Sequence, residues 1–136
     1  MKTKDLENIL TKNEGNDLDS LLDKIDERDF VSYLNSLIRA SALSNAKIIS
    51  LSNIERTYYY QILNGTRTPG KDKVIALALV LKLDLEKTNR LLKLSKNASL
   101  YPKIKRDAVI MYCLGNKYDV YKTNLYLLDH GYEVLK

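Results

Sequence analysis

The sequence has few of the residues that hold small proteins together covalently or through metals. Its 136 residues include one cysteine, Cys113, one histidine, His130, and no tryptophan. A single cysteine excludes a disulfide within the chain, and one cysteine with one histidine is too few for a zinc site. The spacing of these two residues does not favour a catalytic pair, and Cys113 falls on an apolar helical face. We therefore expect a reduced protein with a core cysteine, without metal or cofactor, that is not an enzyme.

Proline, glycine and long apolar runs are scarce as well. The chain has two prolines and five glycines, and no clear alternation of apolar and polar residues that would predict strands. The longest uninterrupted apolar run, Val74 to Leu81, has eight residues and is too short to cross a bilayer. The first residues, Met1 to Asp5, lack the apolar segment of a signal peptide. These absences predict an all-α, soluble, cytoplasmic protein without a membrane partner.

Positive charge is in excess and is unevenly distributed. The chain has 22 basic and 17 acidic residues, a formal charge of +5. Residues 1–30 carry −4, whereas residues 31–136 carry +9, and residues 87–106 contain seven basic side chains and no acidic one. Such a stretch is either a solvated face or a surface for phosphate, and charge alone does not decide between them. The role of residues 87–106 therefore stays open.

Apolar residues recur at the spacing of amphipathic helices along most of the chain. The pattern predicts helices within residues 6–10, 18–25, 30–38, 45–51, 54–63, 74–81, 85–94, 102–114 and 119–128, and a linker over residues 11–16. Residues that commonly cap helices precede the second and third segments, Asn16 or Asp17 for one and Asp26 or Asp29 for the other. His130, beside a glycine, is typical of a helix C-terminus.

The segment from Ser44 to Gly65 predicts two short helices around a sharp turn. Ser44 is placed to cap the first helix, and Asn53 stands at the break, where asparagine tolerates the left-handed conformation that such a turn needs. Apolar residues of both helices point inward (Ile48, Ile49, Ile54, Tyr59 and Ile62). This arrangement is a helix-turn-helix, whose second helix has the size and shape to enter the DNA major groove.

This segment resembles the lambda-repressor-like helix-turn-helix family, also called the XRE family, without a gap. The residues that carry the resemblance are Ser44 at the cap, Asn53 at the turn glycine, Ile54 after the turn, Tyr58 at a frequent tyrosine, Ile62, Asn64-Gly65, and Arg67 with Pro69 in the following basic-x-Pro. The match extends from about Phe30 to Leu92. The resemblance implies a five-helix DNA-binding core, extended here by N-terminal helices and a C-terminal helix pair.

The same resemblance implies which side chains meet DNA. Base contacts fall on the N-terminal part of the second helix, at Arg56, Thr57, Tyr60 and Gln61. Phosphate contacts fall at Ser44, Asn45, Asn64, Thr66, Arg67, Lys71 and Lys73. Arginine pairs with guanine and glutamine with adenine through two hydrogen bonds, each worth roughly 1–3 kcal/mol of discrimination. Glu55, at the cap of this helix, suits the helix dipole but repels phosphate.

An internal repeat is the second informative feature. A shift of 35 residues lays Asp72–Leu100 over Asp107–Leu135 without a gap, with eleven identities in 29 positions where chance gives roughly two or three. The identities include an Asp and a Lys-Thr-Asn triplet, which helical periodicity alone does not produce. We expect the second unit to pack on the first as an extension of the domain, because helix pairs of this length bury their apolar faces by stacking.

Several polar residues of the repeat have structural interpretations. Asn89 and Asn124 are expected to bond a neighbouring backbone carbonyl or the turn rather than a ligand. Two roles are open for Asp107: it either pairs with Arg106 or caps its own helix. The chain then divides into an acidic helical arm (1–26), a lambda-repressor-like domain (27–100) and a helix pair packed on it (101–136).

Two functions compete on this basis. The leading hypothesis is a sequence-specific transcriptional regulator that reads double-stranded DNA with the helix at residues 55–63, either alone or as a homodimer through the arm or the repeat. The alternative is a protein-interaction adaptor, in which Tyr58, Tyr59, Tyr60 and the repeat form the binding surface, because tyrosines suit protein interfaces as well as DNA. Of the three tyrosines, Tyr59 is expected in the core.

Overall fold

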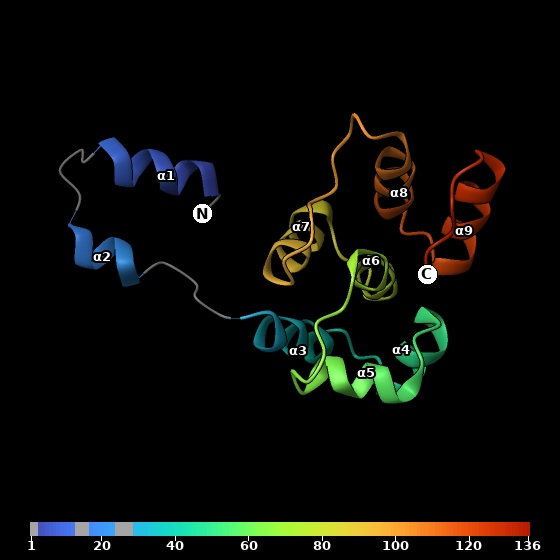
Figure 1. Ribbon diagram of the computed structural model, residues 1–136. Helices are drawn as coiled ribbons and strands as arrows, with labels where there is room; N and C mark the ends of the chain where they lie inside the picture. The colour runs from blue at the N-terminus through green and yellow to red at the C-terminus, as the bar shows by residue number, and fades with distance from the viewer. Residues whose placement is uncertain (1–2, 13–16, 24–28) are drawn as a thin grey trace.

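A computed structural model describes residues 3–12, 17–23 and 29–136, and these segments contain helices and no strand (Figure 1). The helices are α1 (Thr3–Lys12), α2 (Leu18–Asp23), α3 (Phe30–Ala40), α4 (Asn45–Ser52), α5 (Arg56–Leu63), α6 (Lys71–Val80), α7 (Leu85–Leu94), α8 (Lys105–Gly115) and α9 (Val120–Asp129). The expected all-α class is confirmed for this part of the chain. None of these helices is long and apolar enough to traverse a bilayer.

The arm is only partly described. In Figure 1, α1 and α2 stand apart from the other helices. Asp17 precedes α2 and its carboxylate accepts a hydrogen bond from the Asp19 backbone N–H at 3.2 Å, so Asp17 is the residue that caps this helix. Asp29 caps α3 in the same way, through the Ser32 N–H at 2.8 Å. The linker predicted over 11–16 is wrong at Thr11 and Lys12, because α1 continues to Lys12. The rest of that linker, the alternative caps Asn16 and Asp26 and the boundary at residues 26–27 lie outside the described residues.

Helix α6 forms the centre of the body. All of its residues from Val74 to Val80 are buried, as a helix that is apolar on every side requires. Helix α4 and helix α7 both pack against it, and α3 packs against α5 and α7. The amide of Asn35 in α3 donates to the Leu63 carbonyl oxygen at 3.2 Å and so holds the end of α5. The α4–α5 pair is thereby fixed on one side of the body.

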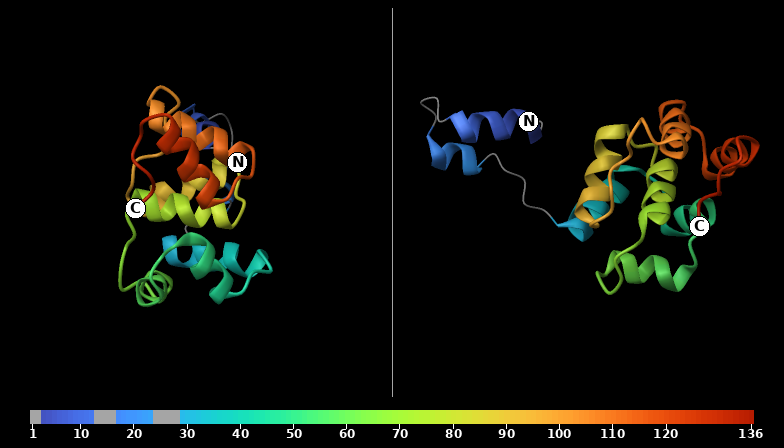
Figure 2. Two further views of the ribbon diagram at one scale, coloured as in Figure 1. Left: turned by 90° about the vertical axis from the view of Figure 1, so that its right-hand side faces the viewer. Right: turned by 45° about the horizontal axis from the view of Figure 1, so that its top comes forward.

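Helices α8 and α9 cover the other side of α6 (Figure 2). Helix α8 packs against α7, and α9 packs against α6 and α8. Cys113 is fully buried, which confirms its place in the core, and burial raises the pKa of its thiol. The expected helix start at Pro102 is wrong, because α8 begins at Lys105 after a turn closed by the Ile104 N–H on the Tyr101 carbonyl oxygen at 3.0 Å.

The two repeat units, α6–α7 and α8–α9, share their local hydrogen bonds. The amide oxygen of Asn89 accepts from the Leu100 N–H at 2.9 Å, and that of Asn124 accepts from the Leu135 N–H at the same distance. The two asparagines therefore have structural partners, although each partner is an N–H group eleven residues along the chain rather than a neighbouring carbonyl. Each of these hydrogen bonds joins the end of a repeat unit to the second helix of the same unit.

The units contact each other reciprocally. The Lys71 ammonium lies 3.1 Å from the Asp107 carboxylate, and the Arg106 guanidinium lies 3.0 Å from the Asp72 carboxylate. Lys71 and Arg106 occupy equivalent positions in the two units, as do Asp72 and Asp107, so each unit supplies the cation for the aspartate of the other. Both proposed roles of Asp107 are wrong, since it neither pairs with Arg106 nor caps α8. This exchange defines a pseudo-twofold axis between the units.

Candidate nucleic-acid interface

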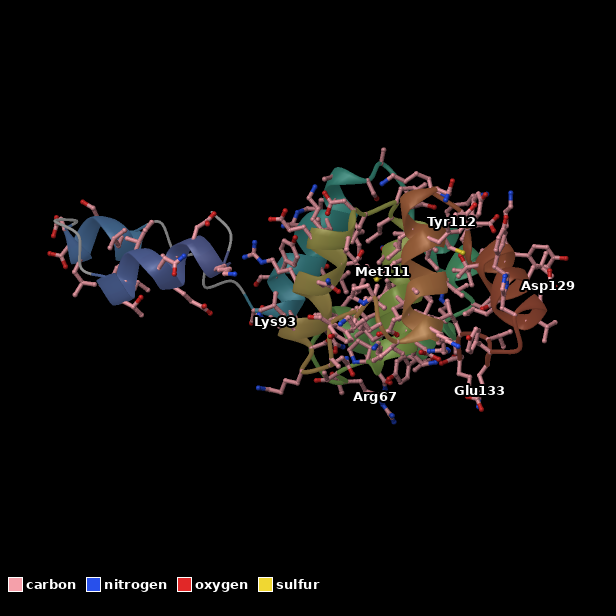
Figure 3. All side chains as sticks on the ribbon, turned by 90° about the horizontal axis from the view of Figure 1, so that it is seen from above. Arg67, Lys93, Met111, Tyr112, Asp129 and Glu133 are labelled. Carbon is pink, nitrogen blue, oxygen red and sulfur yellow. The ribbon has the colours of Figure 1, made fainter. Side chains whose placement is uncertain are left out.

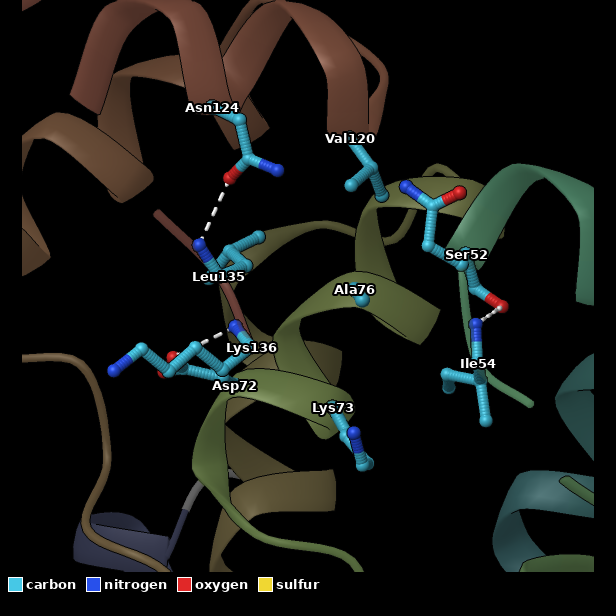
Figure 4. A pocket seen from close by; sticks show the side chains of 10 residues that line it. Ser52, Ile54, Asp72, Lys73, Ala76, Val120, Asn124, Leu135 and Lys136 are labelled. Atoms are coloured by element: carbon cyan, nitrogen blue, oxygen red, sulfur yellow. Dashed lines mark hydrogen bonds between the residues drawn. The ribbon is translucent and has the colours of Figure 1, made fainter. Parts of the chain in front are cut away.

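The turn between α4 and α5 has the expected conformation. Ser44 caps α4, with its hydroxyl oxygen accepting from the Lys47 N–H at 3.1 Å. Asn53 follows α4 with φ 60° and ψ 22°, which is the left-handed region. The hydroxyl of the buried Ser52 accepts from the Ile54 N–H at 3.3 Å (Figure 4). Local hydrogen bonds therefore fix the angle at which the chain enters α5.

Glu55 closes the start of α5. One carboxylate oxygen accepts from the Thr57 N–H at 3.0 Å, and the other accepts from the Tyr58 N–H at 2.9 Å. These two bonds lower the pKa of Glu55, with that from Tyr58 contributing most. The carboxylate thus satisfies two backbone donors of the first turn, and its charge lies beside the exposed residues that begin the helix.

The inner face of α5 is anchored to α4 and to the core. Tyr59 and Ile62 are both fully buried, which confirms the inward position of the middle tyrosine. The Tyr59 hydroxyl donates to the side-chain oxygen of Asn45 at 2.8 Å. Burial, with a smaller contribution from the neighbouring Tyr60, raises the pKa of Tyr59 to about 12. Asn45, expected at a phosphate, therefore uses its oxygen to position α5.

The outer face of α5 gathers the four residues expected to meet bases. Arg56, Thr57 and Tyr60 are exposed, and Gln61 is half-buried. They follow one another at positions i, i+1, i+4 and i+5, so they form one side of the helix. The Arg56 guanidinium lies 5.7 Å from the centre of the Tyr60 ring, which fits a cation–π contact at the tip of this face. A single surface thus presents donors, acceptors and an aromatic edge.

The chain leaves α5 through a compact turn. Gly65 has φ +83°, the left-handed conformation that favours glycine, and an added Cβ would lie 3.4 Å from the Val31 side chain. The side-chain oxygen of Asn64 accepts from the Thr66 N–H at 2.9 Å, and the Arg67 N–H donates to the Gln61 carbonyl oxygen at 3.1 Å. Asn64, Thr66 and Arg67 are all exposed at this end of the helix.

Two of the expected phosphate contacts share one aromatic ring. The Arg67 guanidinium lies 5.5 Å from the centre of the Tyr58 ring, and the Lys73 ammonium lies 5.2 Å from it. Figure 3 shows Arg67 extending outward at the edge of the body. Tyr58 therefore gathers cations from the α5–α6 loop and from α6 on one side of α5. Lys71 differs from them, because Asp107 neutralises its charge.

Lys96 is a cation near this surface that sequence reasoning left unassigned. It lies with Arg67 and Thr68 around a cavity of about 170 Å³. Its position follows from a hydrogen bond between the turn after α7 and the loop before α6, in which the Asn97 amide donates to the Pro69 carbonyl oxygen at 3.0 Å. The only sequence signal was its membership of the basic stretch 87–106, and that signal did not place it beside Arg67.

A second, smaller cavity of about 50 Å³ opens where the α4–α5 turn meets the second repeat unit (Figure 4). Its lining combines Asn53 and Lys73 with Asn124 and Lys136. The Lys136 N–H donates to the Asp72 carboxylate at 3.1 Å, which brings this residue next to α6. The cavity thus adds a lysine to the side of the body that carries Lys73.

The described residues do not bring together the side chains of a metal site. No cluster of three or more histidine, cysteine, aspartate or glutamate side chains that could hold a metal ion occurs in residues 3–12, 17–23 and 29–136. Comparison of the chain with protein-family models, with curated proteins and with solved structures found no match.

Proposed function

We propose that this protein is a sequence-specific, double-stranded DNA-binding transcriptional regulator. In this proposal the α4–α5 pair is a helix-turn-helix of the lambda-repressor-like type, and α5 enters the major groove. The observation that carries the proposal is the outer face of α5, where Arg56, Thr57, Tyr60 and Gln61 stand together on a helix whose opposite face is locked into the core. Rigid presentation of such side chains is what discrimination between base edges requires.

The flanking cations support the same function. Arg67 and Lys73 each lie against the Tyr58 ring, and Lys96 lines the same cavity as Arg67. Exposed cations beside a groove-reading helix neutralise phosphates and make binding weaken as salt rises. Ser44 and Asn45, at the start of α4, offer a hydroxyl and an amide for the backbone on the other side. Lys71 is a weaker candidate because its ion pair with Asp107 competes with phosphate.

The experiment selects binding sites from a random double-stranded DNA library and then measures fluorescence anisotropy over a salt series. We expect an enriched site and a steep loss of affinity as salt rises. Arg56→Ala combined with Gln61→Ala should abolish the preference for that site, whereas Arg67→Ala should weaken all DNA sequences alike. Lys103→Ala removes the same charge from the exposed α7–α8 connection and serves as the control.

A protein-interaction adaptor is the second candidate function. It is favoured by apolar and aromatic side chains that are exposed on the outer helices, among them Tyr112 at 54% and Leu128 at 64%. Under this function the library yields no enriched site even at low salt, and a protein partner stays bound at high salt. That pair of results would overturn the regulator.

A further inference from the structure

The outer face of α9 carries a continuous apolar stripe that nothing in the described chain covers. Tyr121 is 73% exposed, Leu125 41% and Leu128 64%. Their spacing of four and three residues places them on one face of the helix, above one another. Single exposed apolar residues are ordinary on protein surfaces, but a stripe along a whole helix marks a contact surface.

The first repeat unit shows that this stripe is not required by the fold. A shift of 35 residues places Glu86, Arg90 and Lys93 of α7 at the positions of the three stripe residues. The second helix of the repeat unit thus carries charged residues at these positions in the first copy, α7, and apolar residues in the second copy, α9. The apolar side chains of α9 therefore call for a reason other than the stability of the helix pair.

An aromatic cluster widens the stripe toward α8. The ring centres of Tyr118 and Tyr126 are 5.3 Å apart, and that of Tyr112 lies 6.3 Å and 5.8 Å from them. The equivalent residues of the first unit are Leu77, Leu83 and Leu91, all of which are buried. A face that is buried in the first unit is thus partly accessible in the second, where Tyr112 is exposed and Tyr118 and Tyr126 are half-buried; Tyr112 is visible on α8 in Figure 3.

The charges beside the stripe are arranged with opposite signs at its two ends. Lys122 lies in the first turn of α9, with its ammonium 4.1 Å from the centre of the Tyr118 ring. Asp129 is the last residue of the helix, and both residues are exposed. If two such helices pack antiparallel, the lysine of each comes near the aspartate of the other, Tyr121 lies opposite Leu128, and Leu125 meets itself at the centre.

We propose that a second copy of this chain covers the stripe, through α9 packed antiparallel on α9 about a twofold axis at Leu125. The interface is isologous, because one surface with opposite charges at its ends complements itself after a twofold rotation. It lies on the side of α6 away from α5, so it leaves the outer face of α5 accessible (Figure 1, Figure 2). The proposal does not depend on DNA binding.

The test measures the mass of the full chain by sedimentation velocity over a concentration series without DNA. The wild-type chain should sediment as a dimer. The variant Tyr121→Glu, Leu125→Arg, Leu128→Lys copies the residues of the first unit, and it should raise the dissociation constant by roughly 30-fold or more. The matched control is Ile104→Arg, which replaces an apolar side chain of 51% exposure outside the stripe and should leave the dimer intact.

Folding is monitored separately by circular dichroism, so that a misfolded variant is not mistaken for a monomer.

A charge exchange then tests the antiparallel arrangement. Lys122→Asp and Asp129→Lys should each weaken the dimer several-fold, and the double exchange should restore it. A wild-type monomer at every concentration overturns the proposal, as does a dimer unaffected by the stripe variant.

A cysteine cross-link tests whether the twofold axis of the proposed dimer passes near residue 125. Leu125→Cys should form a disulfide between two copies under mild oxidation, whereas Leu128→Cys should not, because an antiparallel pair separates the two copies of residue 128. The native Cys113 is fully buried and does not compete. Cross-linking of Leu128→Cys with none at Leu125→Cys would contradict the antiparallel packing. Failure of DNA selection leaves all these results unchanged, so the two proposals fail separately.

Discussion

Lys82 and Lys117 each donate a side-chain hydrogen bond to the backbone carbonyl oxygen of the other, at 2.7 Å and 3.1 Å. The two lysines are equivalent positions of the repeat, and both have a left-handed backbone, with φ 56° and 59°. A residue can exchange bonds with its own equivalent only close to a twofold axis. The two helix pairs therefore pack as two subunits of a symmetric dimer would, although one chain contains both.

Ion pairs should stabilise the domain to different extents, because they differ in burial. The Asp107 side chain is 4% exposed and receives both the Lys71 ammonium and the Tyr101 N–H. Lys71→Met leaves the buried carboxylate with one donor, and we expect the free energy of unfolding to fall by about 2 kcal/mol in urea titrations. Glu133→Gln breaks a pair with Lys136 that is exposed on both sides and should change it by less than about 0.5 kcal/mol. Equal losses would contradict this ranking.

Asn53 should tolerate glycine better than alanine. Its φ of 60° lies in the region that costs a residue with a Cβ about 1 kcal/mol or more, and asparagine is one of the few residues that adopts it readily. Asn53→Ala should therefore lower the melting temperature, while Asn53→Gly should keep or raise it. Thermal unfolding followed by circular dichroism distinguishes the two, and a better tolerated alanine would refute the role of the turn.

Tyr59 and Tyr118 should ionise well above the ordinary pKa of a tyrosine. Burial raises the pKa of Tyr59 to about 12, and the side-chain hydrogen bond with Tyr126 is the largest cause that raises the pKa of Tyr118 to about 12. An unfolded tyrosine ionises near the ordinary value of 10.0, so the folded state is favoured below pH 10 and loses this contribution as the pH rises from 10 toward 12. Ultraviolet titration should show a late component that shrinks in Tyr59→Phe and in Tyr118→Phe.

Glu55 should stabilise α5 in a pH-dependent manner. Its pKa is lowered from the ordinary 4.5 by the N–H groups of Tyr58 and Thr57, so the unfolded chain takes up the proton first as the pH falls. The stabilisation is then complete above about pH 4.5 and is lost as the pH falls through the lower, folded pKa. Melting temperatures of wild type and Glu55→Ala should differ at pH 7 and converge in strong acid; a constant gap would exclude the carboxylate as the cap.

Local features of the candidate interface could be predicted from the sequence because they depend on near neighbours. Ser44 as a cap, Asn53 as the left-handed residue and Tyr59 as the buried tyrosine each follow from residue type and helical spacing within a few positions. The hydrogen bond from Tyr59 to Asn45 does not, because it depends on the angle between α4 and α5. Asn45 was therefore interpreted only as a group for phosphate.

Contacts between the repeat units could not be predicted for a related reason. Aligning two units shows which residues are equivalent, but it does not show how the units are placed relative to each other. Asp107 was expected to bond within its own unit, whereas the pseudo-twofold arrangement gives it the cation of the other. The place of Lys96 at the same cavity as Arg67 could not be predicted either, since it depends on how the turn after α7 meets the loop between α5 and α6.

The contact of Arg67 and Lys73 with the Tyr58 ring should reduce the side-chain entropy that these residues lose when they bind an anion. A free arginine or lysine side chain loses about 2 kcal/mol of rotamer entropy when a ligand immobilises it. Here one aromatic ring contacts both side chains before any partner arrives and so restricts them. An anion that meets this pair therefore encounters cations that are already largely ordered, and more of the charge attraction is left to hold it.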